Sequence, residues 1–206
     1  MSGGGQAASQ LPTPATSQPL TSGSSTDATR SRTASPASNA GVPVRITVEG
    51  HGVSAPIEAH PTINGGLYIP PDPRRVSWSS NDPRPGDPYG TIILTSHVNY
   101  VINGVNVLGA FHDLPSYQPG ERITLTLQSG KTLTYQVVRN ESYTKAYLAA
   151  HAAMWPALFN ETPSYRPSLG PGHPASAALK LTTCSGPFQA SDGNYLNNSF
   201  VTAYLV

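Results

Sequence analysis

The sequence predicts a mainly β domain, either a closed barrel or a sandwich, that follows a disordered N-terminal segment. Charged residues make up only 11% of the chain, whereas proline and glycine number 21 and 19. This composition suits turns and short strands better than long helices. Short runs that alternate apolar and polar residues are separated by clusters of Pro, Gly, Asn and Asp. Such punctuated alternation is typical of all-β domains.

The N-terminal segment, residues 1–41, consists mostly of Ser, Thr, Ala, Gly, Pro and Gln. Its only large apolar residues are Met1, Leu11 and Leu20. It cannot bury enough surface to offset the entropy lost on ordering. We therefore predict a disordered linker over residues 1–41, either a stalk or a tail without a role, and one globular domain over residues 42–206.

Eight strands are predicted in the globular domain. The first, residues 44–48, alternates apolar and polar side chains as a half-buried strand does. The others cover residues 55–58, 66–69, 91–98, 122–127, 132–138, 178–184 and 199–206.

One helix interrupts the β pattern. Residues 145–155 are rich in alanine and are followed by Pro156, which predicts a helix that ends there. Residues 160–176 are dense in Pro, Gly and Ser and predict a long surface loop that leads to the last pair of strands.

Composition and motif spacing argue against several classes of function. The formal net charge of +1 gives no field that would attract nucleic acid or an anionic membrane. No apolar run approaches the length of a membrane span, and the N-terminus does not resemble a signal peptide, so a membrane anchor is expected to be absent from this chain. No two histidines lie three to five residues apart, so neither a metal nor another cofactor is predicted.

Cys184 is the only cysteine, and it ends the apolar, β-favouring run of residues 179–184. A free cysteine is often a small buried core residue, but a thiol beside a base is a nucleophile. Of the six histidines, only His97 ends an apolar strand. Side chains alternate along a strand, so Thr95 and His97 share one face, as do Thr182 and Cys184. The two groups would meet at one rim if their strands were neighbours; a buried thiol and a hydrogen-bonded rim histidine are the alternatives.

With these two residues located, the whole domain from residue 44 to residue 206 resembles a sortase, closest to the class F group of actinobacteria. The resemblance is carried by Val44-Arg45-Ile46, Leu67-Tyr68-Ile69-Pro70-Pro71-Asp72-Pro73, the Pro85-Gly86-Asp87-Pro88 turn, the run from Gly90 through His97 to Val98, Leu181-Thr182-Thr183-Cys184, and then Phe188, Gly193, Tyr195, Asn198 and Val201.

The resemblance implies a closed eight-stranded β-barrel with one or two short helices. It also implies cysteine transpeptidation of a sorting signal similar to Leu-Pro-x-Thr-Gly. Cys184 matches the nucleophile that forms a thioacyl enzyme, and His97 matches the group that protonates the leaving amine and deprotonates the incoming one. Thr183, Ser185 and Asn198 are expected to support the oxyanion or the substrate.

Partners and location also follow from the resemblance. The donor would be the sorting-signal peptide of a secreted protein, and the acceptor an amine of a cell-wall precursor or of another protein. The enzyme would act outside the cytoplasm, at the cell surface. Substrate choice is expected to depend on residues 143–176.

The sequence departs from the sortase pattern at two places. An arginine is expected on the strand after the cysteine, but Leu196 occupies that place and no arginine follows Arg166. Arg139, Arg166 and Asn198 are candidates to replace it. Ser96 stands where a glycine is expected before His97. These departures leave open a barrel that binds sorting signals without efficient chemistry, and a cysteine hydrolase in which water resolves the thioester.

Overall fold

The computed structural model describes residues 41–160 and 176–206. The predicted linker, residues 1–41, and the predicted loop, residues 160–176, lie almost entirely outside these ranges. Both therefore stay predictions.

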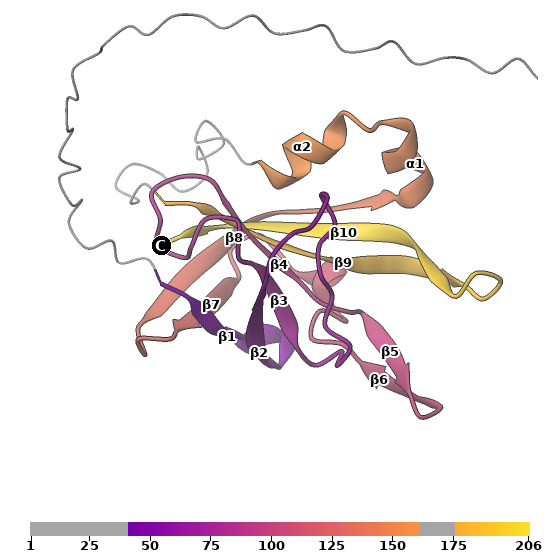
Figure 1. The fold of residues 1–206 in the computed structure, drawn as a ribbon, viewed down its shortest axis with the longest axis horizontal. Helices are drawn as coiled ribbons and strands as arrows, with labels where there is room; N and C mark the ends of the chain where they lie inside the picture. Colours follow the sequence, from indigo (N-terminus) through magenta and orange to yellow (C-terminus); the bar gives the residue numbers. More distant parts are fainter. Residues whose placement is uncertain (1–40, 161–175) are drawn as a thin grey trace, which may run out of the picture. The chain divides into compact units, whose positions relative to one another are not determined.

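Eight strands close into a barrel in the order β1-β2-β3-β4-β9-β10-β8-β7 (Figure 1). Neighbours are antiparallel except for two parallel pairs, β2 with β3 and β4 with β9. The strands are β1 (Pro43–Val48), β2 (Val53–His60), β3 (Val76–Ser79), β4 (Thr91–Thr95), β7 (Arg122–Leu127), β8 (Thr132–Thr144), β9 (Ala178–Gln189) and β10 (Asn194–Leu205). The prediction of a mainly β, closed eight-stranded barrel is confirmed.

Alternation along the strands sorts apolar side chains into the barrel. On β9, Leu179 and Leu181 are fully buried in the main core, whereas Thr182 and Cys184 point to the other face. On β10, Val201 and Ala203 belong to the main core, whereas Phe200 joins a smaller cluster with Leu148 and Leu158. This cluster lies beneath two short helices, α1 (Lys145–Ala150) and α2 (Met154–Phe159).

The single helix predicted over residues 145–155 is wrong in its extent, because two helices stand there. The Thr144 hydroxyl caps α1 by accepting a hydrogen bond from the Tyr147 amide at 3.0 Å. At His151 the backbone leaves the helical region (φ −123°, ψ 54°), which ends α1. Pro156 does not end a helix. It sits in the first turn of α2, where its missing N–H costs no intrahelical hydrogen bond.

Two strand predictions also differ from the structure, and one barrel strand was not predicted. Residues 66–69 form no strand; Asn64 (φ 51°) and Gly65 (φ 75°) instead make a tight turn that pairs Ile63 with Gly66. The barrel strand at this place in the chain is β3, which alternation could not reveal because all four of its residues are buried. The strand predicted over residues 91–98 ends at Thr95.

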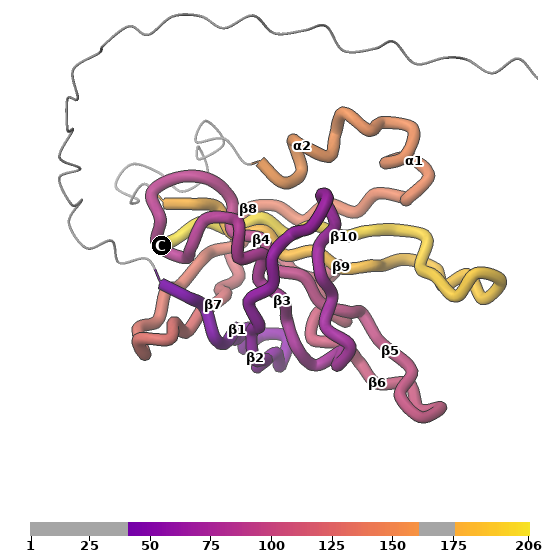
Figure 2. Tube along the Cα trace, in the orientation of Figure 1, coloured from indigo at the N-terminus to yellow at the C-terminus, as the bar shows by residue number. Residues whose placement is uncertain are grey.

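The sequence pattern also missed a hairpin. Strands β5 (Asn99–Ile102) and β6 (Val105–Leu108) form a separate two-stranded sheet beside the barrel (Figure 2). Asn103 and Gly104, both at positive φ, make its turn. The hairpin begins two residues after His97, so it directly adjoins the predicted site.

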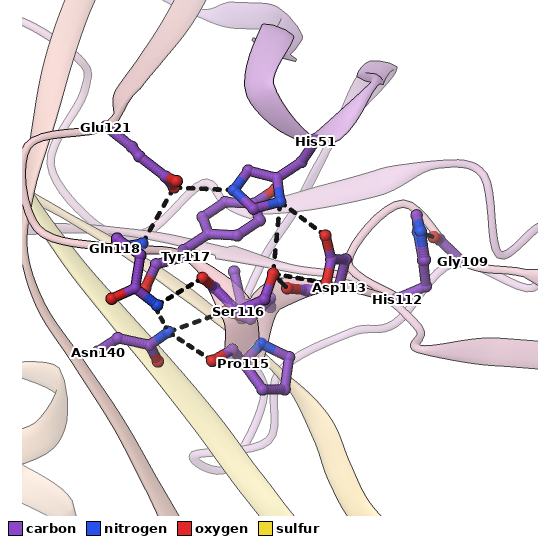
Figure 3. Close-up of polar contacts among 11 residues, drawn as sticks. His51, Gly109, His112, Asp113, Pro115, Ser116, Tyr117, Gln118, Glu121 and Asn140 are labelled. Carbon is purple, nitrogen blue, oxygen red and sulfur yellow. Dashed lines mark hydrogen bonds and ion pairs between the residues drawn. The ribbon is translucent and has the colours of Figure 1, made fainter.

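A polar cluster joins two short 3₁₀ helices, η1 (Glu49–His51) and η2 (Leu114–Ser116), to the segment before β7 (Figure 3). His51 Nδ1 lies 2.6 Å from Asp113 Oδ2, and His51 Nε2 lies 2.8 Å from Glu121 Oε2. The His51 ring also stacks on Tyr117 at 3.9 Å. The cluster therefore fastens η2 to the connection between β1 and β2 and to the residue that precedes β7.

Candidate active site

The parallel pairing of β4 with β9 brings the two predicted catalytic residues to one edge of the sheet. Leu94 pairs with Leu181, and Thr95 pairs with Thr182. His97 follows Thr95 by two residues, as Cys184 follows Thr182. A hydrogen bond from the Thr183 hydroxyl to the Ser96 carbonyl, at 2.8 Å, extends the contact beyond the last paired residues. The alternation of side chains was readable from the sequence, but this long-range pairing was not.

Cys184 is partly buried and lines a pocket of about 320 Å³ on the outside of the barrel. Strands β4, β9 and β10, helix α2 and the segment after β2 contribute to its walls. The lining is mostly apolar and consists of Gly65, Leu67, Ile69, Thr95, Trp155, Phe159, Thr182, Thr183, Cys184, Asn198 and Phe200. Such a pocket can hold an apolar side chain of a peptide next to the thiol.

His97 follows the end of β4 by two residues and does not line this pocket. Burial lowers the pKa of His97, and an interaction with the backbone of Pro70 raises it by a smaller amount, so the net shift is downward. A lowered pKa favours the neutral imidazole, which is the form that can take a proton from a thiol or an amine.

The backbone around His97 is held from two sides. The His97 carbonyl accepts a hydrogen bond from the Phe111 amide at 3.2 Å, and the Val98 carbonyl accepts one from the Gly109 amide at 2.9 Å. A side chain at Gly109 would place its Cβ 1.9 Å from the His97 carbonyl oxygen. Only glycine at position 109 allows this close approach to the backbone of His97. The sequence did not reveal this requirement, because the two segments meet only in the folded structure.

Asn198 lies directly opposite Cys184 on β10 and lines the same pocket. Leu196 precedes Asn198 by two residues on β10 and is 40% exposed. Arg139, on β8, is opposite Thr202 and forms an ion pair with Glu141 at 2.7 Å. Arg166 lies outside the described residues. Asn198 is thus the candidate that the structure brings to Cys184, and its carboxamide offers two N–H donors.

The hydroxyls of Thr183 and Ser185 are engaged within the protein. Thr183 donates to the Ser96 carbonyl, and Ser185 accepts from the Ser199 hydroxyl at 2.7 Å. Ser199 Oγ in turn lies 2.6 Å from Ser142 Oγ. These hydrogen bonds join β9 to the segment before His97 and to β10. The two side chains therefore brace the nucleophile's strand, and their role toward an oxyanion stays a prediction.

Neither a metal site nor a membrane span emerges from the described part of the chain. Within residues 41–160 and 176–206, no three His, Cys, Asp or Glu side chains are grouped so that they could hold a metal ion. Within the same ranges, no helix is both long and apolar enough to cross a membrane.

Known proteins resemble the chain in sequence and in fold. The sortase domain model matches residues 46–206. The fold resembles the Clostridium perfringens Sortase D5 transpeptidase (TM-score 0.50, 16% identity, 81% of this chain and 79% of that one). It also resembles a lid mutant of sortase A from Corynebacterium diphtheriae (0.52, 17%, 82% and 73%) and the SrtA sortase from Actinomyces oris (0.52, 17%, 84% and 83%). Among curated proteins, none matches significantly.

The structural matches, all below 25% identity, establish the fold alone. The family model, in contrast, covers nearly the whole barrel, including His97, Cys184 and Asn198. On this evidence the chain belongs to the sortase family, whose members are cysteine transpeptidases.

Proposed function

We propose that the protein cleaves a sorting signal similar to Leu-Pro-x-Thr-Gly and transfers the acyl part to an amine of the cell wall or of another protein. The parallel pairing of β4 with β9 supports this proposal, because it makes the strand that leads to His97 a neighbour of the strand that carries Cys184, and Cys184 lines an apolar pocket. A neutral base next to a thiol is the arrangement that nucleophilic cysteine catalysis needs.

In the first half-reaction, His97 takes the proton of the Cys184 thiol, and the sulfur attacks the carbonyl carbon that follows the threonine of the signal. The carbon–sulfur bond forms, the carbon–nitrogen bond to glycine breaks, and His97 gives its proton to the leaving amine. In the second half-reaction, an acceptor amine attacks the thioester carbon. His97 takes a proton from this amine, and Cys184 leaves as a thiol once the proton is returned to it.

The developing oxyanion needs donors close to Cys184. Asn198 is proposed as one of them, since it faces Cys184 across the β9–β10 pair. Backbone N–H groups beside Cys184 are proposed as the others, with Thr183 and Ser185 supporting the strand. No metal or other cofactor takes part in these steps.

The finer assignment rests on the resemblance of the residues quoted above. We propose that the protein is a class F sortase of an actinobacterium that acts outside the cytoplasm, at the cell surface, on secreted proteins. Residues 1–41 would serve as a flexible linker before the catalytic domain, residues 42–206. Nucleic acid is not a proposed partner, given the formal net charge of +1.

Incubation of the protein with Leu-Pro-x-Thr-Gly peptides and an amine tests the proposal. Wild type is expected to give both the cleaved peptide and the amine adduct, whereas Cys184→Ala and His97→Gln give neither above background. An absence of turnover across a panel of sorting peptides and amines would contradict the proposal.

Leu196 at the place of the expected arginine leaves two alternatives open, a barrel that binds sorting signals without efficient chemistry and a cysteine hydrolase. Peptide binding that survives Cys184→Ala, with no thiol-dependent turnover in wild type, would identify the binding barrel. Cleavage without an amine adduct, at any amine concentration, would identify the hydrolase.

A further inference from the structure

The β5–β6 hairpin contacts the side chain of His97 through Tyr100. The ring of Tyr100, on β5, packs against the imidazole with the two ring centroids 5.0 Å apart and the planes at 41° to each other. Favourable ring pairs have centroids about 4.5–7 Å apart. Because Tyr100 is itself 48% exposed, its ring covers the histidine at the surface and does not belong to the core.

The hairpin is anchored to the barrel strand β10 by hydrogen bonds of Asn99. The Tyr195 hydroxyl, on β10, donates to Asn99 Oδ1 at 2.8 Å. Asn99 Nδ2 in turn donates to Asn106 Oδ1 on β6 at 2.6 Å. Successive side chains of a strand point to opposite faces. Strand β5 therefore contacts β10 through Asn99 and the imidazole of His97 through Tyr100.

The backbone contacts of His97 do not by themselves fix the direction of its ring. The hydrogen bonds from the Phe111 and Gly109 amides hold the main chain at His97 and Val98. The two side-chain torsions of a histidine can still change, so the direction of the imidazole depends on what the ring touches. Proton transfer needs a ring nitrogen within hydrogen-bond reach of the reacting group. A ring packed against the imidazole therefore limits how often that geometry is lost.

We propose that Tyr100 is a positioning residue for catalysis: its ring packs against the imidazole of His97 and restricts the direction in which the ring nitrogens point. The hydrogen bond from Tyr195 to Asn99 holds the hairpin, and with it Tyr100, at β10. The inference rests on the proposed function, in which His97 moves protons at Cys184.

Steady-state kinetics with a Leu-Pro-x-Thr-Gly peptide as donor and hydroxylamine as acceptor tests this role. Tyr100→Ala is expected to lower kcat about tenfold, because the imidazole spends less time in the productive direction. The KM for the peptide stays within about twofold of wild type, since Tyr100 does not line the pocket beside Cys184. Tyr100→Phe, which keeps the ring, should retain the kcat of wild type.

Val101→Ala is the matched control. Val101 is the next residue on β5 and is 61% exposed, but its side chain points to the face opposite Tyr100. The substitution shortens a side chain of the hairpin and leaves the ring contact in place, so kcat should not change.

The pKa of His97 gives a readout that does not depend on turnover. Burial is the largest cause of its lowered pKa, and no charged side chain of the described residues is among the causes. Removal of the Tyr100 ring admits water to the imidazole, so the pKa of His97 should rise toward the ordinary value of about 6.5 in Tyr100→Ala. It should stay lowered in Tyr100→Phe and Val101→Ala. Proton NMR titration of the imidazole measures this shift.

Tyr195→Phe tests the anchor, because it removes only the hydroxyl that donates to Asn99. Loss of this hydrogen bond is expected to lower kcat about threefold. In a Tyr100→Ala background the same substitution should have no further effect, since the anchor acts through Tyr100. Losses that multiply in the double variant would overturn this part of the proposal.

A folded Tyr100→Ala variant with the kcat and the His97 pKa of wild type would overturn the role of Tyr100. Equal losses of kcat in Tyr100→Ala and Tyr100→Phe would do the same. If Tyr100→Ala does not fold, the effect of Tyr195→Phe on kcat and on the pKa of His97 takes its place. If wild type itself turns over no peptide, the proposed function fails separately, and the pKa of His97 in the variants still decides the role of Tyr100.

Discussion

At the scale of single residues, the site depends on where a few polar groups are held rather than on unusual residues. Cys184 and His97 were both identifiable in the sequence as reactive groups at strand ends. The close approach of Gly109 to the His97 carbonyl was not, because it forms only when the chain folds. The pKa of His97 is lowered by a burial that only the assembled structure reveals.

Gly109→Ala is expected to damage catalysis strongly. The added Cβ would lie 1.9 Å from the His97 carbonyl oxygen, which is a backbone atom and can yield only if the segment carrying His97 moves. A shift of this kind is expected to lower kcat/KM by about a hundredfold. Gly50→Ala is the control, since a Cβ at Gly50 meets nothing within 4 Å. Equal kcat/KM values for the two variants would show that His97 does not depend on this close approach.

Alanine substitutions can distinguish the contributions of Asn198 and Leu196 to catalysis. Asn198→Ala removes donors opposite Cys184 and is expected to lower kcat about a hundredfold, the effect of losing one oxyanion donor. Leu196→Ala removes only a partly exposed apolar side chain and is expected to leave kcat nearly unchanged. Peptide turnover by both variants measures this difference. A larger loss at Leu196 than at Asn198 would remove Asn198 from the proposed mechanism.

At the scale of elements, the structure explains why some predictions were right and others wrong. Strands β1, β7 and β8 alternate clearly, so their existence was readable in advance. Strand β3 is buried on both faces, and the β5–β6 hairpin exposes much of its apolar surface, so neither has the expected alternation. The helix region was predicted as one element because proline in a first turn looks the same in sequence as proline at a helix end.

The His51 cluster predicts a dependence of stability on pH. Burial alone would lower the pKa of His51, but the hydrogen bonds and charges of Asp113 and Glu121 outweigh it and raise this pKa. Only the imidazolium can donate from both ring nitrogens (Figure 3). A raised folded-state pKa means that this stabilisation is complete below the unfolded value and is lost as pH rises through the folded value.

Urea unfolding at several pH values measures this effect. Between mildly acidic and mildly alkaline pH, wild type should lose more free energy of unfolding than His51→Gln, which cannot be protonated. His151→Gln is the control, because His151 is exposed on the outside of α1 and contacts no carboxylate in the described residues. If the free energy of unfolding depends on pH in the same way in wild type and in His51→Gln, the prediction is contradicted.

Helix α2 is expected to contribute to substrate choice, as proposed for residues 143–176. Trp155 and Phe159 project from α2 into the pocket beside Cys184. Trp155→Ala should raise the KM for the sorting peptide several-fold and change kcat little, because it removes contact with the bound peptide rather than with the reacting atoms. Tyr147→Ala on α1, outside the pocket lining, is the control.

Grafting another sortase's 143–176 segment should change peptide preference. An unchanged preference would argue against a role of this segment in substrate choice.

At the scale of the whole molecule, the closed barrel is what turns two separate motifs into one site. The order β3-β4-β9-β10 places β4, which ends two residues before His97, next to the strands of Cys184 and Asn198, although His97 and Cys184 are 87 positions apart in the chain. Composition and strand spacing predicted a mainly β domain, and the sortase resemblance chose the closed barrel over a sandwich. The neighbour relations did not, because many barrel topologies share the same alternation.

The central claim is that Cys184 carries the acyl group between donor and acceptor. Intact-protein mass spectrometry after rapid mixing with a Leu-Pro-x-Thr-Gly peptide, without an amine, measures this directly. Wild type should gain the mass of the peptide up to its threonine, the adduct should map to Cys184, and hydroxylamine should remove it. Peptide cleavage that proceeds without any adduct, or that persists in Cys184→Ala, would contradict the account.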